Sequence, residues 1–376
     1  MDRLLSSGRS SEIDLSRRFD AAYRVLEEAI AARAFPGCAF GVLAGGEVAV
    51  EGALGRFTYD EGSPAVRPDT IFDLASVTKV VATTAAAMLL HQRGALDLDT
   101  PLGELLPGFI IGRPSVDHAR HVTLRHLLAH SSGLPGYVEF FRTAATPADL
   151  LRACLELTLE TEPGARAEYS DPGFILLGKA LEVVMHESLS SWVQREILAP
   201  LEMRSTMYSP PIALRTAIPP TEDDTKFRHR IIQGEVQDEN AWVLKGVAGH
   251  AGLFSNVPDL LRFAGAILRA VGKTGADSGR PALFREETVR LFAERQGPEG
   301  SSRALGWDTP SEDSTSGTRF SRHSIGHLGF SGTSMWIDLD ADVAVILLTN
   351  RTWPDRASRQ IRQVWPAFHD AVRGAL

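Results

Sequence analysis

Ser76 and Lys79 are the residues whose types and spacing most directly suggest chemistry. They stand three positions apart in an otherwise apolar stretch, Ile71–Leu90, so both fall on one face of a predicted helix. A serine hydroxyl becomes a nucleophile when a neighbouring base takes its proton. A lysine among apolar side chains is expected to have a lowered pKa, because burial disfavours its charged form. Asp73 is expected to be the helix N-cap, which leaves the Ser76 amide able to stabilise an oxyanion.

A tyrosine in a turn is the second candidate element. The segment Glu168–Gly173 precedes an apolar helix that is expected to begin near Phe174, and Tyr169 in this turn can reach into a cleft. Beside a serine and a lysine, its hydroxyl could take part in proton transfer. The alternative is a buried loop tyrosine whose hydroxyl is bonded to the backbone.

A histidine followed by a glycine supplies the third element. In Gly326–Gly332, which leads into a predicted strand, His327 offers a polar donor and Gly329 lets a substrate approach the backbone closely. The amide of Phe330 is a second candidate oxyanion donor. The alternative is a glycine-rich strand entry with a surface histidine. A literal Lys-Thr-Gly triplet at 273–275 is set aside, because its polar surroundings have no strand character.

These elements, in this order, resemble the serine β-lactamases of the class C type, the DD-peptidases and the related family VIII-like carboxylesterases. Two further segments, Val122–Pro135 and Gly246–Ser255, resemble stretches of the same superfamily, and the likeness extends over residues 20–372. The resemblance implies a nucleophile, Ser76, the proton-transfer groups Lys79 and Tyr169, and the oxyanion-side residues His327, Gly329 and Phe330. Whether Lys79 or Tyr169 is the acylation base stays open, because the two titrate as a coupled pair.

Two departures from the family pattern bear on the substrate. Asp171 stands where the family usually has an asparagine that contacts a substrate amide carbonyl. A carboxylate there repels a carbonyl oxygen unless it is protonated or salt-bridged. His327 replaces a lysine, which reduces the positive charge available for a substrate carboxylate. Both departures favour esters or small amides over β-lactams and cell-wall peptides.

The sequence therefore predicts a serine hydrolase that works through an acyl-enzyme, with short acyl esters as substrates. A DD-peptidase- or β-lactamase-like amide hydrolase and an acyltransferase are alternatives, because all of them form an acyl-enzyme. A non-catalytic sensor of acyl ligands or peptidoglycan fragments on the same fold is a third alternative. The joint presence of all the catalytic residue types argues against the sensor.

The elements that must position these residues are strands at both ends of the chain and helices in the middle. Apolar periodicity predicts an amphipathic helix over 14–33, and strand patterns separated by turns predict hairpins at 39–54 and 334–348. A final helix is expected over 355–371. The economical arrangement is an α+β fold in three layers, α/β/α, with helices on both faces of one antiparallel sheet that the two ends of the chain form together.

The fold is predicted to be one catalytic unit, residues 1–376, in two parts. These are an α/β part made of 14–99 and 251–376 and an inserted, mostly helical part over 100–250. Within the helical part, a short helix is expected between an N-cap at Thr123 and a C-cap at Gly133. Polar stretches at 272–280 and 297–316 are predicted to be loops.

Composition excludes several other function classes. The chain has 376 residues, of which 44% are hydrophobic and 23% charged, as in ordinary globular proteins. A net charge of −8 and the lack of basic runs argue against nucleic-acid binding. No stretch approaches the ~20 apolar residues of a membrane span. The N-terminus lacks the apolar region of a signal peptide and the two cysteines lie far apart, so a cytoplasmic protein with reduced thiols is expected.

No metal or cofactor is expected. His126 and His130 lie four positions apart, but Leu127 stands where a zinc peptidase needs glutamate. Both histidines are expected on a polar helix face, with His130 favourably placed near the helix C-terminus. The expected partner is a small ester or amide substrate, and the sequence leaves the oligomeric state open.

Overall fold

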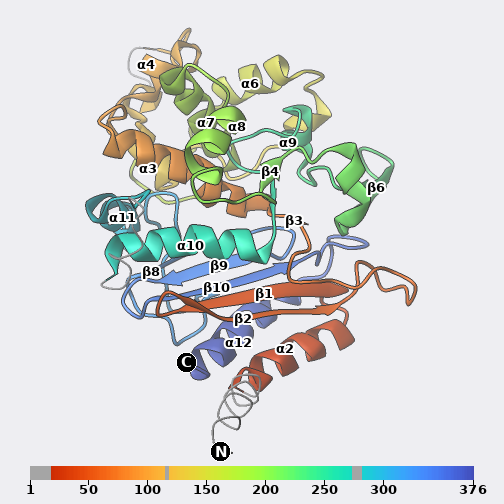
Figure 1. Cartoon of the computed structure of the whole chain (residues 1–376). Coiled ribbons are helices and arrows are strands. Elements are labelled where there is room, and N and C mark those ends of the chain that lie inside the picture. Colours follow the sequence, from red (N-terminus) through yellow and green to blue (C-terminus); the bar gives the residue numbers. More distant parts are fainter. Residues whose placement is uncertain (1–17, 115–117, 273–281) are drawn as a thin grey trace, which may run out of the picture.

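A five-stranded antiparallel sheet, built from both ends of the chain, forms the centre of the molecule (Figure 1). The structure is a computed structural model that describes residues 18–114, 118–272 and 282–376. The strand order is β2–β1–β10–β9–β8, so β8 lies at one edge. The strands are β1 (Gly37–Ala44), β2 (Glu47–Gly55), β8 (Ser324–Leu328), β9 (Ser334–Asp338) and β10 (Val343–Thr349). The two predicted hairpins are β1–β2 and β9–β10.

Both faces of the sheet are covered by helices, which confirms the predicted three layers. Helices α2 (Asp20–Ala31) and α12 (Ile361–Gly374) lie together on one face, and α10 (Val257–Val271) lies on the other (Figure 1). Side chains of a strand alternate between faces, so β10 buries Val345 toward α2 and α12 and Ile346 in the core on the other side. Burial on both sides explains why this strand is apolar throughout.

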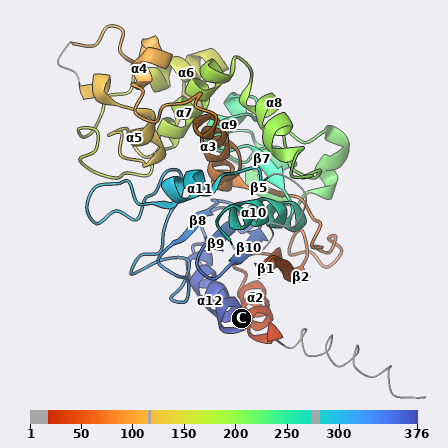
Figure 2. The same ribbon diagram turned by 60° about the vertical axis from the view of Figure 1, so that its left-hand side comes forward.

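The middle of the chain is mostly helical and lies beyond α10 as seen from the sheet (Figures 1 and 2). The longer helices of this part are α3 (Ala85–Gln92), α6 (Pro147–Leu155) and α7 (Asp171–Met185). A further helix, α11 (Glu286–Ala293), follows α10 in the sequence. Shorter helices are α4 (Leu102–Leu105), α5 (Leu124–Leu128), α8 (Leu189–Val193) and α9 (Glu239–Val243). The division of the chain at residues 100 and 250 stays a prediction.

Short irregular helices and strands connect these elements. The 3₁₀-helices are η1 (Ala75–Val77), η3 (Pro107–Phe109), η4 (His118–His121), η5 (Phe140–Arg142) and η7 (Ile212–Ala217), and the π-helices are η2 (Lys79–Thr84) and η6 (Gln194–Leu198). A three-stranded sheet has the order β3–β7–β4 and a two-stranded sheet pairs β5 with β6. Their strands are β3 (Phe72–Asp73), β4 (Met207–Tyr208), β5 (Pro220–Asp224), β6 (Arg230–Gln233) and β7 (Leu253–Ser255).

Helix boundaries differ from the sequence expectations at several places. Thr123 is the N-cap of α5, as predicted, and it forms a capping box with His126. Gly133 is not the C-cap, because α5 ends at Leu128 and His130 already has a left-handed φ of 54°. The C-terminal helix begins at Ile361, six residues later than its predicted start at 355, and ends at Gly374.

Candidate active site

The segment that carries Ser76 is not the uninterrupted helix that its apolar run predicts. It consists of strand β3, the 3₁₀-turn η1, the π-helix η2 and then α3. Asp73 lies in β3 and is not a helix N-cap; its carboxylate accepts hydrogen bonds from the amides of Ala75 and Gln237, both at 2.8 Å. Ala75, immediately before Ser76, has a φ of 45°. Such a conformation costs a non-glycine residue on the order of 1 kcal/mol and is typical of functional sites.

Ser76 and Lys79 are in direct contact, as their spacing predicts. Lys79 Nζ donates to Ser76 Oγ at 3.0 Å. Lys79 is fully buried, whereas Ser76 is partly exposed, so a substrate can reach the hydroxyl. The same Nζ donates to Asp171 Oδ1 at 2.6 Å and to the His250 carbonyl at 3.2 Å. Three acceptors match the three N–H bonds of an ammonium group.

The pKa of Lys79 is raised, which contradicts the lowered value expected from burial alone. Burial lowers this pKa, but the negative charge of Asp171, with a further contribution from Tyr169 and the hydrogen bonds of both, raises it by more. Asp171 is the first residue of α7, and its side chain is only 14% exposed. Lys79 therefore rests as a cation, and Asp171 is a salt-bridged carboxylate.

Tyr169 lies beside both members of this pair. Its ring centroid is 4.7 Å from Lys79 Nζ, and its hydroxyl is close enough to Lys79 and Ser76 for both to lower the pKa of the phenol. Burial raises the pKa of the phenol, and the positive charge of Lys79 opposes that shift. The arrangement places a serine hydroxyl, a cation and a phenol side by side, which is what a proton transfer to and from Ser76 would require.

His130 positions the Tyr169 turn, a role that its place in the sequence did not indicate. It does not lie on a polar helix face, since it is only 2% exposed. Its Nδ1 accepts a hydrogen bond from the amide of Ser170, the N-cap of α7, at 2.9 Å, and its ring stacks on Tyr169 at 4.6 Å. Burial, together with the positive charges of Arg303 and Lys79, holds the pKa of His130 well below its ordinary value, so the ring is neutral.

Strand β8 brings His327 to Tyr169, with their ring centroids 5.9 Å apart. His327 is 3% exposed, so it is not a surface histidine. Its Nδ1 donates to the Leu328 carbonyl at 2.8 Å, which leaves the lone pair on Nε2, and no described residue bonds that atom. Burial, then the charges of Lys79 and Arg303, hold its pKa well below the ordinary value. His327, which was expected to be a hydrogen-bond donor, is thus a neutral ring whose free Nε2 is an acceptor.

The turn between β8 and β9 is fastened to the backbone just before Ser76. Ser331 Oγ donates to the Asp73 carbonyl at 2.8 Å, and Thr333 Oγ1 donates to the Leu74 carbonyl at 3.0 Å. Both hydroxyls are buried, so these bonds are shielded from water. The edge of the main sheet and the nucleophile segment therefore form one rigid junction.

Gly329 makes this junction possible. A Cβ at this position would lie 2.4 Å from the Leu74 carbonyl oxygen and 2.0 Å from Thr333 Oγ1, so only glycine fits. The two candidate oxyanion donors are the backbone amides of Phe330, which follows Gly329, and of Ser76, which follows Ala75. The close approach brings their two backbone segments together, as an oxyanion site formed by two amides requires.

His250 supplies the third acceptor for Lys79 and is itself held in place. Its Nε2 donates to Asp238 Oδ1 at 2.9 Å, and Asp238 caps α9 by accepting from the Ala241 amide at 2.7 Å. His250 is part of Gly246–Ser255, a segment that the sequence singled out. The role of His250 and Asp238 as a support for the lysine could not be read from spacing.

The other features considered in the sequence add no residue to this site. The Lys-Thr-Gly triplet at 273–275 lies outside the described residues. Across 18–114, 118–272 and 282–376, no group of three or more His, Cys, Asp or Glu side chains is arranged to hold a metal ion. None of the helices in these ranges is both long enough and apolar enough to span a bilayer.

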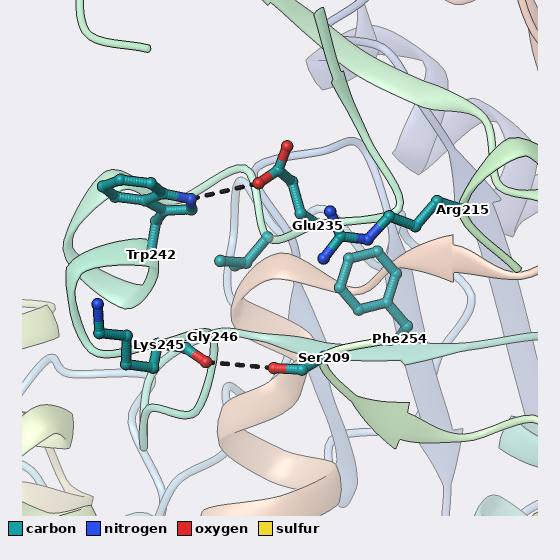
Figure 3. Close-up of a pocket in the computed structure, with 8 residues that line it drawn as sticks. Ser209, Arg215, Glu235, Trp242, Lys245, Gly246 and Phe254 are labelled. Carbon is teal, nitrogen blue, oxygen red and sulfur yellow. Dashed lines mark hydrogen bonds between the residues drawn. The ribbon is translucent and has the colours of Figure 1, made fainter. Parts of the chain in front are cut away.

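A separate pocket of about 210 Å³ lies between α9, β4 and β7 (Figure 3). Trp242 Nε1 donates to Glu235 at one side of it, and Ser209 Oγ donates to the Lys245 carbonyl at the other. None of the residues around Ser76 lines this pocket. It is therefore distinct from the group of residues around Ser76 described above.

Comparison with known proteins agrees with this geometry. The family model described as Beta-lactamase matches residues 23–366. The N-acetylmuramyl-L-alanine amidase of Bacillus subtilis strain 168 is 30% identical over 359 residues, which cover 87% of this chain and 80% of that protein. A protein of Salmonella paratyphi B named for D-alanyl-D-alanine carboxypeptidase activity is 30% identical over 315 residues, 75% of this chain and 70% of its own length.

Solved structures show the same fold. EstCE1, described as a hydrolase with promiscuous acyltransferase activity, aligns with a TM-score of 0.76 at 22% identity, covering 96% of this chain and all of that one (100%). A penicillin-binding protein homologue from Caulobacter crescentus aligns with a TM-score of 0.72 at 18% identity, covering 96% of this chain and 98% of the other. The fold is that of β-lactamases and transpeptidases, and the chain belongs to the Beta-lactamase family of serine hydrolases.

Proposed function

We propose that the protein hydrolyses carboxylic esters through an acyl-enzyme formed on Ser76. The observation that carries this proposal is the 3.0 Å contact between Lys79 Nζ and Ser76 Oγ, with the Tyr169 ring centroid 4.7 Å from the same Nζ. Ser76 Oγ forms a bond to the carbonyl carbon, and the bond from that carbon to the leaving oxygen breaks. Water then attacks the acyl-enzyme and releases the acid and free Ser76.

The proton from Ser76 must leave through Lys79 or Tyr169. Lys79 is an ammonium at rest, so it can accept a proton only after it gives one away, and Asp171 Oδ1 at 2.6 Å is the nearest described acceptor. Tyr169, whose ring lies 4.7 Å from Lys79 Nζ, is the group that returns a proton to the leaving oxygen. In the deacylation step the same groups act on water in the reverse sense.

Negative charge on the carbonyl oxygen would be stabilised by the amides of Ser76 and Phe330. Backbone donors fixed before the reaction are effective because they need no reorganisation as the charge develops. The hydrogen bonds of Ser331 and Thr333 to the segment before Ser76 support such fixation.

Amide hydrolysis is the second candidate, and a specific observation favours it. The salt bridge of Asp171 to Lys79 relieves the repulsion that a free carboxylate would exert on an amide carbonyl. The names of the curated relatives, an amidase and a carboxypeptidase, point the same way. Acyl transfer to an alcohol or amine shares the acyl-enzyme step and would be detected by adding such acceptors.

The test is the intact mass of the protein after incubation with a fluorophosphonate, which labels activated serines without any assumption about the substrate. Wild type should gain one adduct and Ser76→Ala none. Ser311→Ala, which removes an exposed serine, is the matched control and should label as wild type does. A folded wild type without an adduct would overturn the proposal and favour a non-catalytic acyl-ligand or peptidoglycan-fragment sensor.

A further inference from the structure

The pocket beside α9 is lined by two cations, Arg215 of η7 and Lys245, which follows that helix (Figure 3). Across 18–114, 118–272 and 282–376, no side chain forms an ion pair or a hydrogen bond with either charged group. The Nε of Arg215 is also buried, so this donor is shielded from water and has no acceptor in the described part of the chain. A buried donor without an acceptor is unfavourable, and an anion in the pocket would supply one.

Glu235 also lines the pocket, but its charge is balanced by a residue outside it. Arg230 forms two hydrogen bonds with this carboxylate, one of them 2.8 Å long between Nη2 and Oε2. Burial raises the pKa of Glu235, and the pairing with Arg230 lowers it by more. Arg215 and Lys245 therefore leave the pocket with a net positive charge.

Aromatic rings form two walls of the pocket. Figure 3 shows Trp242 on the same side as Lys245, and Phe254 on the same side as Arg215. The indole of Trp242 is held by its 3.2 Å hydrogen bond to Glu235 and by an edge-to-face contact with Phe227, with the ring centroids 5.5 Å apart. A ring that is already held in place can pack on a flat ligand with little loss of side-chain entropy.

The rim of the pocket has a strained backbone. Ser209 and Lys245 have φ values of 47° and 65°, in the left-handed region that residues other than glycine rarely adopt. Gly246 has a φ of 79°, and a Cβ there would lie 2.6 Å from Ser209 Oγ. That hydroxyl donates to the Lys245 carbonyl at 3.2 Å, which fastens the two sides of the rim. Strained residues of this kind are concentrated at functional sites, where surrounding contacts impose a fixed geometry.

Arg215 is held at the pocket by two further segments of the chain. A Cβ at Gly234 would lie 2.5 Å from Arg215 Cα and 2.6 Å from its Cβ, so only glycine leaves room for the arginine to pack there. Gln233 Nε2 donates to the Ile218 carbonyl at 2.8 Å, which ties the end of η7 to β6. The Arg215 side chain thus starts from a fixed backbone, as selective recognition of a ligand requires.

The base of the pocket separates it from Ser76. Phe254 lies in β7, whose backbone pairs at this residue with Asp73 of β3 on one side and with Met207 of β4 on the other. Phe254 is 1% exposed, so it closes the pocket toward the core. Because no residue around Ser76 lines the pocket, a ligand there does not need the space that a substrate at Ser76 would occupy.

We propose that this pocket binds a small ligand in which an anionic oxygen group, a carboxylate or a phosphate, is attached to a flat ring. Arg215 binds the anionic group, because a guanidinium is suited to paired oxygen acceptors. Lys245 adds positive charge at the other side, and the ring packs on Trp242 and Phe254. The site is separate from the chemistry proposed for Ser76 and does not depend on it.

Isothermal titration calorimetry with three small probes tests this proposal. Benzoate and phenyl phosphate carry both the ring and the charge, whereas benzyl alcohol carries the ring alone. Wild type should bind at least one of the anions roughly 10- to 100-fold more tightly than benzyl alcohol, the range of a charge-assisted hydrogen bond. A preference for phenyl phosphate would identify a phosphate ligand, and a preference for benzoate would identify a carboxylate.

Variants of the lining residues locate the binding. Arg215→Gln should remove the advantage of the anion over benzyl alcohol. Lys245→Gln should weaken anion binding by roughly 2- to 5-fold, as is typical of an exposed charge. Trp242→Ala should lower the affinity for phenyl phosphate toward that for inorganic phosphate. Arg24→Gln, which removes an exposed charge on α2 at the far side of the main sheet, is the matched control and should bind as wild type does.

Ser76→Ala should also bind the anions as wild type does, since the pocket shares no lining residue with the group around Ser76. None of the probes is a carboxylic ester or an amide, so the result does not depend on turnover. Absence of anion binding, or equal affinity for the anions and benzyl alcohol, would overturn the proposal. So would anion binding that Arg215→Gln leaves intact or that Ser76→Ala abolishes.

Discussion

Lys79 Nζ lies 2.6 Å from Asp171 Oδ1, and this ion pair sets the resting charge of the group that we propose for catalysis. A lysine buried to the same extent without the carboxylate would lose its proton more readily. The pair therefore reverses the direction of the lysine pKa shift that its apolar surroundings suggest. Replacing the carboxylate with the amide usual in the family tests this directly.

Asp171→Asn should move the rising limb of the pH–rate profile to lower pH. The base must be deprotonated to act, and removal of the Asp171 charge lets burial lower the pKa of Lys79. The measurement is kcat/KM for a neutral acetate ester from pH 5 to 10. Asp313→Asn, at an exposed aspartate, is the control. A limb that stays in place would mean that Lys79 is not the titrating base.

Lys79→Met should lower kcat/KM by about 100-fold or more, the lower range for loss of an acid–base group. The variant also leaves Asp171 without its cation, which destabilises the fold. The double variant Lys79→Met/Asp171→Asn removes the stranded charge, so it should recover thermal stability but not activity. Recovery of activity in the double variant would contradict a chemical role for Lys79.

Gly329→Ala should lower kcat by about 100-fold while leaving KM within a fewfold, because a Cβ 2.4 Å from the Leu74 carbonyl forces the Phe330 amide away. Gly62→Ala is the matched control, since nothing lies within 4 Å of a Cβ there. Steady-state kinetics on one neutral ester suffices. A normal kcat in Gly329→Ala would remove Phe330 from the oxyanion site.

Stability should fall as the pH drops from about 6.5 to 4, in part through His369. This buried ring bonds the Thr315 carbonyl and Ser334 Oγ, and burial lowers its pKa to about 4. The unfolded chain binds a proton below its ordinary pKa of 6.5, whereas the folded chain does so only below about 4. The contribution of His369 to the free energy of unfolding is therefore fully lost below about pH 4, and this loss amounts to about 3 kcal/mol.

The variant His369→Gln should show a correspondingly shallower fall in the free energy of unfolding between these pH values, measured by urea denaturation. His229→Asn, at an exposed histidine, should keep the wild-type slope. An unchanged slope in His369→Gln would show that other groups account for the acid sensitivity.

Local patterns predicted the parts of the molecule that depend on local spacing. The strands at both ends follow from short apolar segments bounded by turn residues, and the contact of Ser76 with Lys79 follows from their three-residue separation. The Asp171 partner of Lys79 stands 92 residues away, so no local rule could connect them or give the sign of the lysine pKa shift. Arg303 lies in a polar stretch predicted to be a loop. It comes near Tyr169 because its backbone pairs with Asp308, which in turn pairs with Gly326 of β8.

The pairing of β1 with β10 has a consequence for the order in which the chain can fold. Cys38 lies opposite Thr349, near the two ends of the sequence, so the central sheet closes only after almost the whole polypeptide has been synthesised. Contacts between such distant segments carry a large loop-closure entropy and form slowly. Ser76 is made early, but its junction with the β8–β9 turn forms late. A nascent chain therefore carries Ser76 long before the surroundings of that serine are complete.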